Sequence, residues 1–172
     1  MVETPSYEIF RKIDDVEIRR YPKLILATVF GNDAYPPFRI LFNYISGNNS
    51  GGNKISMTAP VLTPEKIDMT APVISRDGSM SFILPSKYSV EEVPEPNDAR
   101  IKIIETPERK IAVIKFRGWA RNKSVEKQKN RLISVLTSKN VKMVGNPFLM
   151  RYNSPWTPGF LRRNEIAIEV LE

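Results

Sequence analysis

The two halves of this 172-residue chain contain strand-like and helix-like segments in the same order. Lys23–Gly31 (KLILATVFG) is an apolar run that precedes a stretch with helical periodicity. Lys110–Gly118 (KIAVIKFRG) has the same place in the second half, 87 residues later. At the same offset, Gly78–Leu84 matches Glu165–Leu171 in position and pattern. Equal spacing over most of the chain predicts two similar halves.

The repeated order also predicts the class of fold. A chain of this length suits one domain with its own core, so we expect residues 1–172 to form a single domain. Its pseudo-repeats would cover about residues 7–85 and 100–172. Strands and a helix in each half favour an α+β fold. We expect a distorted antiparallel β-barrel of two pseudo-symmetric halves, with both helices packed outside.

Two segments are predicted to be helical. The first has apolar residues at i, i+3, i+4 and i+7, which are Phe38, Leu41, Phe42 and Ile45. We expect Asn32 or Asp33 to cap this helix and Gly47 to lie at its C-terminal end. The second helix is predicted over Asn122–Lys139, where apolar side chains share one side and lysines keep the other soluble.

The expected strands are short runs rich in β-branched and aromatic residues, bounded by turn residues. They are Tyr7–Ile13, Val16–Tyr21, Leu24–Phe30, Met80–Leu84, Ile101–Glu105, Ile111–Phe116, Phe148–Tyr152 and Glu165–Leu171. Asp14-Asp15 is typical of a turn between the first two strands, and Ser89–Asp98 is typical of a connecting loop.

One eight-residue segment is written twice, as KISMTAPV at Lys54–Val61 and as KIDMTAPV at Lys66–Val73. Because proline cannot donate a ladder hydrogen bond, each copy is expected to be an edge strand or irregular. Leu62–Glu65, between the copies, is expected to be a turn. Period-two alternation places Met57 and Met69 on an apolar face, where methionine suits variable apolar ligands. The alternative is that both methionines are ordinary core residues.

The chain has no cysteine and no histidine. Disulfides, thiolate nucleophiles and cysteine-based zinc sites are therefore excluded. The commonest general base and the commonest axial ligand to haem iron are absent as well. A catalytic triad of the usual nucleophile–histidine kind cannot be built from this composition.

The charge and the hydropathy pattern bear on partners and location. The formal net charge of +7 is spread along the chain rather than concentrated in a run, which favours a solvated basic surface over a nucleic-acid site. The longest apolar run, Leu24–Phe30, is far shorter than the roughly 20 residues of a membrane span. The first residues resemble no signal peptide, so we expect a cytoplasmic protein.

Three segments carry a resemblance to a known family. The doubled segment is followed by MSFILPSKY (Met80–Tyr88), the chain opens with YEIFRKIDDVEIRRY (Tyr7–Tyr21), and it ends with RYNSPWTPGFLRRNEI (Arg151–Ile166). Together these resemble the SOUL/haem-binding protein family over essentially the whole chain. The resemblance implies a distorted β-barrel with two outer helices, and the binding of haem or another tetrapyrrole.

The resemblance also implies a shallow apolar groove beside the first helix and the late proline-rich loop. The expected groove residues are Phe38, Leu41, Phe42 and Ile45 of the helix, Met57 and Met69 of the doubled segment, and Tyr152, Pro155 and Trp156 of the loop. Arg39 and Arg162 are the expected partners of the propionates, with Lys54, Lys66 and Arg163 as alternatives. Iron, if bound, would have a methionine or tyrosine ligand. The alternative for the helix is that its apolar stripe only packs on the sheet.

From these observations we predict non-catalytic binding of haem, a porphyrin or a similar flat apolar anion, by a protein that is a monomer and does not bind nucleic acid. The alternative is a small-molecule hydrolase or effector-binding domain that uses a pocket glutamate. Glu165 or Glu169 in the last strand would then be the general base, with a pKa raised by burial. Arg162–Glu165 could bind an anion, or pair with neighbouring charges at a strand end.

Overall fold

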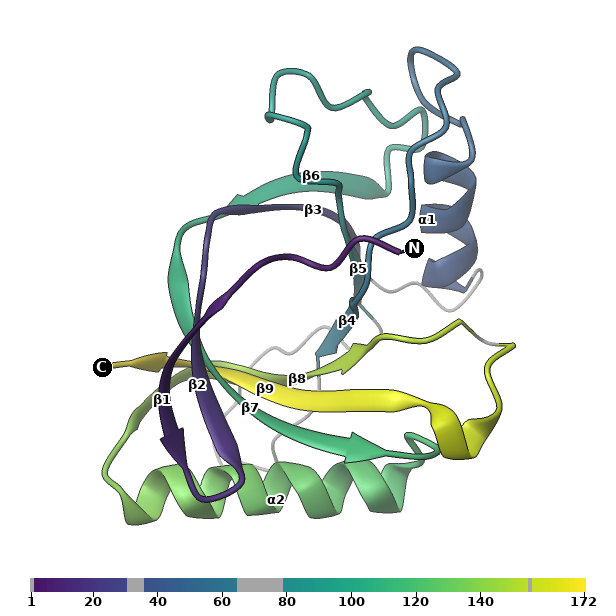
Figure 1. Cartoon of the computed structure of the whole chain (residues 1–172). Helices are drawn as coiled ribbons and strands as arrows, with labels where there is room; N and C mark the ends of the chain where they lie inside the picture. Colours follow the sequence, from purple (N-terminus) through teal and green to yellow (C-terminus); the bar gives the residue numbers. More distant parts are fainter. Residues whose placement is uncertain (1, 31–35, 65–78, 155) are drawn as a thin grey trace.

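The strands of the computed structural model form one antiparallel sheet, with a helix packed on each half (Figure 1). The structure describes residues 2–30, 36–64, 79–154 and 156–172. In chain order the elements are β1 (Glu8–Ile13), β2 (Val16–Tyr21), β3 (Leu24–Val29), α1 (Pro37–Ile45), β4 (Val61–Pro64), β5 (Met80–Ile83), β6 (Ile101–Thr106), β7 (Arg109–Arg117), α2 (Asn122–Ser138), β8 (Lys142–Arg151), the 3-10 turn η1 (Gly159–Leu161) and β9 (Arg163–Leu171).

The strand order of the sheet is β1-β2-β7-β9-β8-β4-β5-β3-β6, and it is symmetric apart from the end strand β1. β4 pairs with β8 at the centre, with Val61 opposite Arg151. Outward from this pair, one half reads β4-β5-β3-β6 and the other β8-β9-β7-β2. Each half contains the chain order strand, helix, strand, strand, as β3-α1-β4-β5 and β7-α2-β8-β9. The predicted α+β fold with two pseudo-symmetric halves is therefore confirmed.

The barrel is open. Within the part of the chain that the structure describes, the two end strands of the sheet, β1 and β6, do not pair with each other. The curved sheet wraps around an interior that includes Leu26, Ile83, Val113 and Met150. The candidate site does not lie at these end strands, but between α1, the inner strands β4 and β5, and the loop after β8.

Both helices bury one face against the sheet. α2 contacts β7, β8 and β9 and buries Val125, Leu132, Val135 and Leu136. α1 contacts β3 and β5 and buries Ile40, Leu41, Tyr44 and Ile45. A fully buried leucine or isoleucine side chain contributes about 1.5–3 kcal/mol by leaving water. These two faces therefore fix the helices in place.

The first helix begins at Pro37, with Pro36 at the N-cap position and no side chain capping it. Proline fits the first turn of a helix because the amide hydrogen it lacks would have no intrahelical partner there. The expected caps, Asn32 and Asp33, lie outside the described residues. Gly47 follows the helix with a φ of 122°, a left-handed backbone that favours glycine, as expected for a C-terminal end.

Leu62–Glu65 was expected to be a turn, and this is wrong over Leu62–Pro64. Residues 54–60 are irregular, but Val61–Pro64 forms β4, an inner strand that pairs with both β5 and β8. The missing amide hydrogen of Pro60 falls just before the ladder, and Pro64 is the last residue of the strand. Proline is tolerated at such strand ends. The second copy of the doubled segment lies outside the described residues.

β8 is longer than predicted. It begins at Lys142, six residues before the expected start at Phe148. Its pairing with β9 shifts register between Val144 and Phe148, and Gly145 has a φ of 69°. A bulge of this kind inserts glycine and proline into a strand without ending it. Turn residues in the sequence therefore mark an irregularity here, not a boundary.

Candidate functional site

An apolar cavity of about 650 Å³ lies between α1, the stretch before and within β4, the start of β5 and the loop after β8. Its volume falls within the range of roughly 300–1,000 Å³ that is usual for small-molecule sites. The described lining residues are Val2, Phe38, Phe42, Met57, Thr58, Ala59, Val61, Thr63, Met80, Arg151, Tyr152, Asn153, Ser154 and Trp156. None of these residues is an aspartate or a glutamate.

α1 presents two phenylalanines to the cavity. Phe38 and Phe42 lie one turn apart, and their rings are stacked with centroids 6.0 Å apart. Phe38 also rests edge-on against Phe82 of the core, at 5.4 Å. Phe42 keeps 47% of its surface exposed although it is large and apolar. An exposed aromatic next to a cavity is a more informative observation than a buried one.

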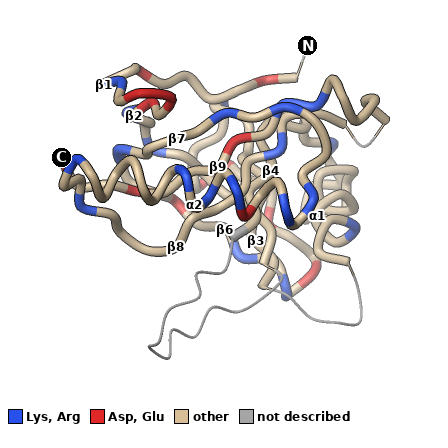
Figure 2. The backbone as a smooth tube through the Cα atoms, turned by 90° about the horizontal axis from the view of Figure 1, so that it is seen from below, with Lys and Arg blue, Asp and Glu red and all other residues tan. Residues whose placement is uncertain are grey.

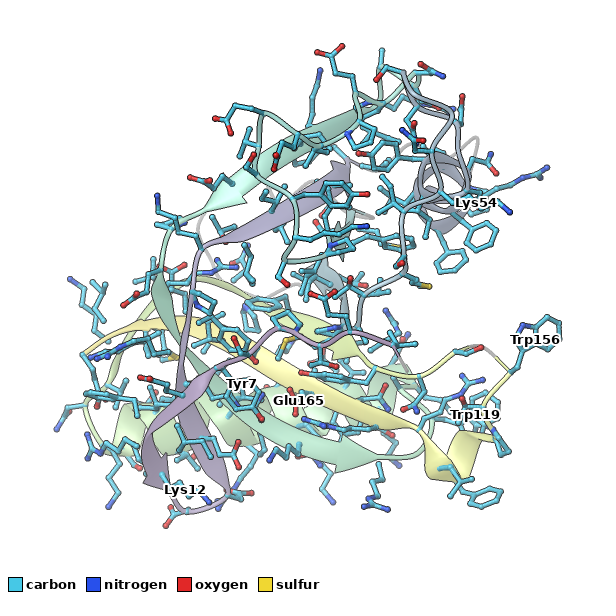
Figure 3. The ribbon with its side chains drawn as sticks, turned by 45° about the horizontal axis from the view of Figure 1, so that its top comes forward. Tyr7, Lys12, Lys54, Trp119, Trp156 and Glu165 are labelled. Atoms are coloured by element: carbon cyan, nitrogen blue, oxygen red, sulfur yellow. The ribbon has the colours of Figure 1, made fainter. Side chains whose placement is uncertain are left out.

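The helical stripe predicted from the sequence therefore divides into two sets. Leu41 and Ile45 face the core, with 0% and 5% of their surface exposed, and they do not line the cavity. Arg39 is exposed on the helix and is not a lining residue either. Lys54 lies near α1 and is exposed (Figure 3). The structure thus brings Phe38 and Phe42, but not the other predicted residues of the helix, to the cavity.

The first copy of the doubled segment supplies the floor. Met57 is half-buried and packs against the α1 core cluster, and it lines the cavity. The next residues are held by the N-terminal segment, because the Ala59 N–H donates to the Glu3 carbonyl at 2.9 Å. The hydroxyl of Thr58 is buried, and no hydrogen-bond partner for it occurs among the described residues. Met69 lies outside them.

Met80 also lines the cavity and was not predicted from the sequence to do so. It is the first residue of β5, and β5 pairs with β4 so that Phe82 faces Val61. β5 therefore begins at the cavity, which Met80 lines together with Met57. Only the strand partners could have revealed it, and the sequence had indicated a turn where β4 lies.

The loop after β8 closes the other side. Tyr152 and Trp156 both line the cavity, and Trp156 stands at the rim with 93% of its surface exposed (Figure 3). Pro155, also predicted, lies outside the described residues. The hydroxyl of Tyr152 donates to Glu165 Oε2 at 2.7 Å, and the Arg163 guanidinium lies 4.3 Å from the centre of the Tyr152 ring. Glu165 therefore holds the hydroxyl of Tyr152, and Arg163 packs on the face of its ring.

Glu165 belongs to a buried ion cluster beneath this wall. Arg19 of β2 and Glu165 of β9 are both 0% exposed and form a two-pronged pair, with Nη1–Oε2 at 2.8 Å and Nη2–Oε1 at 3.0 Å. Arg163 Nη2 donates to Glu165 Oε1 at 2.6 Å, and Arg19 also bonds Glu17 and Tyr21. No local sequence pattern pointed to Arg19, which lies 146 positions before its partner.

The ionisation of Glu165 follows from these contacts. Burial by itself opposes the charged form, but the hydrogen bonds and charges of Arg19 and Arg163, with the Tyr152 hydroxyl, outweigh it. The pKa of Glu165 is therefore lowered, whereas a general base at neutral pH needs a raised one. The same site raises the pKa of Tyr152, first through burial and then through the charge of Glu165.

Glu169, the other candidate base, lies elsewhere. It accepts a hydrogen bond from Arg109 Nη1 at 3.3 Å and lines a separate surface hollow near the end of β9. Neither glutamate thus faces the apolar cavity. Among the described residues, the apolar cavity therefore has no carboxylate in its lining that could act as the general base of the hydrolase hypothesis.

The cations differ from those expected. Arg162 does not line the apolar cavity. Its Nε donates to the Thr157 carbonyl at 2.9 Å, and its guanidinium lies 4.4 Å from the centre of the Trp119 ring. The arginine that lines the cavity is Arg151, whose Nη1 donates to Thr63 Oγ1 at 2.8 Å. Other basic residues are distributed along the chain among acidic ones, as Figure 2 shows.

A protein-family model described as SOUL heme-binding protein matches residues 2–169. The chain belongs to the SOUL haem-binding protein family. This confirms the resemblance that the doubled segment and the two ends of the chain indicated. Comparison with curated proteins finds no match.

Solved structures share the fold of this SOUL protein at low sequence identity. The C-terminal domain of EcmrR is 11% identical, with a TM-score of 0.60, over 96% of this chain and 98% of that one. A hydrolase from Listeria innocua is 10% identical, with a TM-score of 0.59, over 94% of both chains. An uncharacterised conserved protein from Listeria innocua is 9% identical, with a TM-score of 0.61, over 99% and 93%. Such identities show the fold alone.

Two further properties concern the whole described chain. Across the described ranges, no helix has both the length and the apolar character that a membrane crossing requires. In the same ranges, no three acidic side chains gather into a cluster that could hold a metal ion.

Proposed function

We propose that this SOUL protein binds a haem, a porphyrin or a similar flat apolar anion in the cavity between α1 and the loop after β8, without catalysing a reaction. The observation that carries the proposal is the lining itself, in which Phe38, Phe42, Met57, Met80 and Trp156 surround a space of about 650 Å³. Aromatic rings and flexible thioethers pack well on a planar apolar molecule.

Polar groups at the edge of the cavity support an amphipathic ligand. Arg151 supplies a guanidinium, which suits a carboxylate because of its fork of donors. The buried hydroxyl of Thr58, unpaired among the described residues, would gain a hydrogen bond from a polar atom of a bound molecule. A pocket with an apolar body and a few polar groups is the usual form of a small-molecule site.

The residues present fit a porphyrin ring better than a strongly ligated iron. With no histidine or cysteine, the candidate iron ligands among the described lining residues are Met57, Met80 and Tyr152. The Tyr152 hydroxyl is already donated to Glu165 and its pKa is raised, so it is poorly suited to become a phenolate ligand. The thioethers of Met57 and Met80 are left as candidates. We therefore propose that apolar contact with the macrocycle supplies most of the affinity, with or without iron.

The test is titration with protoporphyrin IX and with hemin, followed by the Soret band and by tryptophan fluorescence. The chain has two tryptophans, Trp119 and Trp156, so the titration uses Trp119→Phe and Trp156→Phe variants. Because Trp156 lines the cavity, the Trp119→Phe variant, in which Trp156 is the reporter, should show saturable quenching. Absence of saturable binding at micromolar ligand would reject the proposal.

The cytoplasmic location, the monomeric state and the absence of nucleic-acid binding remain predictions.

A further inference from the structure

A second, smaller pocket of about 120 Å³ lies at the start of α2, and its lining is cationic. The residues that line it are Trp119, Ala120, Arg121, Arg151, Asn153, Arg162 and Asn164. Three of these seven are arginines and none is acidic. We call this the arginine pocket. Guanidinium groups bind carboxylate and phosphate oxygens through paired hydrogen bonds, so such a lining suits an anion.

The arginines are held in place by their neighbours. Arg162 is fixed by its bond to the Thr157 carbonyl and by its position over the Trp119 ring, and Arg121 lies 5.8 Å from the same ring. Trp119 itself packs against Gly159, where an added Cβ would overlap the indole. A site whose groups are already positioned loses less conformational entropy on binding than one built from mobile chains.

The arginine pocket and the apolar cavity share a wall. Arg151 and Asn153 line both of them. Arg151 sits on β8, opposite Val61 of the cavity and opposite Asn164 of the arginine pocket. A molecule that fills the cavity therefore has a cationic recess at one edge of its binding place. α2 begins at Asn122 with no acidic residue in its first turn, so the positive end of its dipole adds to the potential there.

We propose that the arginine pocket binds a carboxylate of the same molecule whose apolar body occupies the cavity. This inference rests on the proposed function and makes it more specific. The ligand class becomes a planar apolar acid whose carboxylate extends from one edge, and a neutral ring of the same shape becomes a weaker ligand. Of the two arginines that the resemblance implied, Arg162 lines this pocket, together with Arg121 and Arg151, whereas Arg39 lines neither pocket.

The experiment compares protoporphyrin IX with its dimethyl ester, which keeps the ring and removes the charges. Binding is measured for the wild type, for Arg121→Gln/Arg162→Gln and for the matched control Arg39→Gln, an exposed arginine on α1. Losing charged hydrogen bonds of about 1.4 kcal/mol or more corresponds to about tenfold weaker binding of the acid. The ester should change by less than about twofold, and Arg39→Gln should bind both as the wild type does. Thermal unfolding confirms that each variant is folded, and the single Arg121→Gln variant, expected to show part of the loss, replaces the double variant if that does not fold.

The outcomes separate this inference from the proposed function. If the wild type binds acid and ester equally, or the arginine variants weaken both alike, the arginine pocket does not hold the carboxylate. If neither porphyrin binds, the proposed function fails, and benzoate is then titrated on Trp156→Phe with Trp119 as the reporter. A saturable benzoate response that the arginine substitutions remove would still support an anion site, whereas no response would overturn that too.

Discussion

The hydroxyl of Tyr152 donates a 2.7 Å hydrogen bond to the fully buried carboxylate of Glu165. Tyr152 also lines the apolar cavity, so one side chain connects the cavity wall to the buried ion cluster of Arg19 and Glu165. Glu165 is in turn held by Arg19 from β2 and by Arg163 at the start of β9. The position of the wall thus depends on strands from both ends of the sequence, which explains how a loop residue can be fixed firmly enough to bind.

Tyr152→Phe tests this connection. The substitution keeps the ring in the cavity but leaves Glu165 without one of its donors, which should lower the free energy of unfolding by about 1–3 kcal/mol. Porphyrin affinity should fall by much less, since the apolar contact remains. Urea unfolding and porphyrin titration of the variant measure the two effects.

The matched control is Tyr88→Phe, because the Tyr88 side chain is partly exposed and no hydrogen bond of its hydroxyl is found in the described residues. It should change stability by no more than about 0.5 kcal/mol, as surface substitutions usually do. If both variants lose the same amount, the Tyr152–Glu165 bond does not stabilise the fold.

The lowered pKa of Glu165 predicts a loss of stability in acid. Between its ordinary value of 4.5 and its lower value in the folded state, the unfolded chain binds a proton that the folded chain does not. The contribution is complete above pH 4.5 and disappears as pH falls through the folded-state pKa. Free energies of unfolding measured from pH 7 down to pH 3 should show this decrease.

Glu165→Gln identifies the residue responsible. At pH 7 it should destabilise the protein by up to about 3–5 kcal/mol, because the buried Arg19 charge loses its fully buried carboxylate partner and keeps only Glu17 among the described residues. Below pH 4.5 the wild type progressively loses the stability that the ionised Glu165 contributes, so the difference in free energy of unfolding between the two proteins should narrow as the pH falls. A difference that stays constant with pH would assign the acid sensitivity to other carboxylates.

Leu41 and Phe42 are adjacent in α1, but Leu41 faces the core and Phe42 faces the cavity. Substituting each in turn separates effects on stability from effects on binding. Leu41→Ala should lower the free energy of unfolding by about 2–5 kcal/mol, since its side chain is fully buried. Phe42→Ala should cost far less stability, since Phe42 is 47% exposed, but it should weaken porphyrin binding clearly. Chemical unfolding and fluorescence titration of both variants provide the comparison. Equal loss of affinity in the two, once folded, would move the site away from α1.

The sequence predicted the fold where local pattern and tertiary structure agree. The run Val16–Tyr21 became β2 without change, and the spacing of 87 residues anticipated the matching places of β3 and β7. β4 was missed because its short length, its final Pro64 and the preceding Pro60 are typical of a turn, while its strand character comes from pairing on both sides. Pairing between distant segments decides such cases, and no local pattern contains it.

The candidate site was predictable to a similar degree. The resemblance to the family implied a groove that includes Phe38, Phe42, Met57, Tyr152 and Trp156, and the structure places these residues around one cavity. The helical stripe could not tell Leu41, in the core, from Phe42, at the rim, because both lie on one broad face. Arg151 was missed because it reaches the cavity only through the pairing of β8 with β4, which no local sequence pattern indicates. Their roles in binding stay predictions until a ligand is titrated.

Gly159→Ala tests whether Trp119 is held as the arginine pocket requires. An added Cβ would overlap the indole, so Trp119 must move and Arg162, which lies over its ring, must lose that contact. In a Trp156→Phe background, the emission of Trp119 should shift toward that of a fully exposed indole. The same substitution should weaken the binding of protoporphyrin IX more than that of its dimethyl ester.

Gly52→Ala is a useful control, since a Cβ there meets nothing within 4 Å and any strain comes from its φ of 61° alone. Unchanged Trp119 emission in Gly159→Ala would show that the indole is free to adjust and that its packing does not position Arg162.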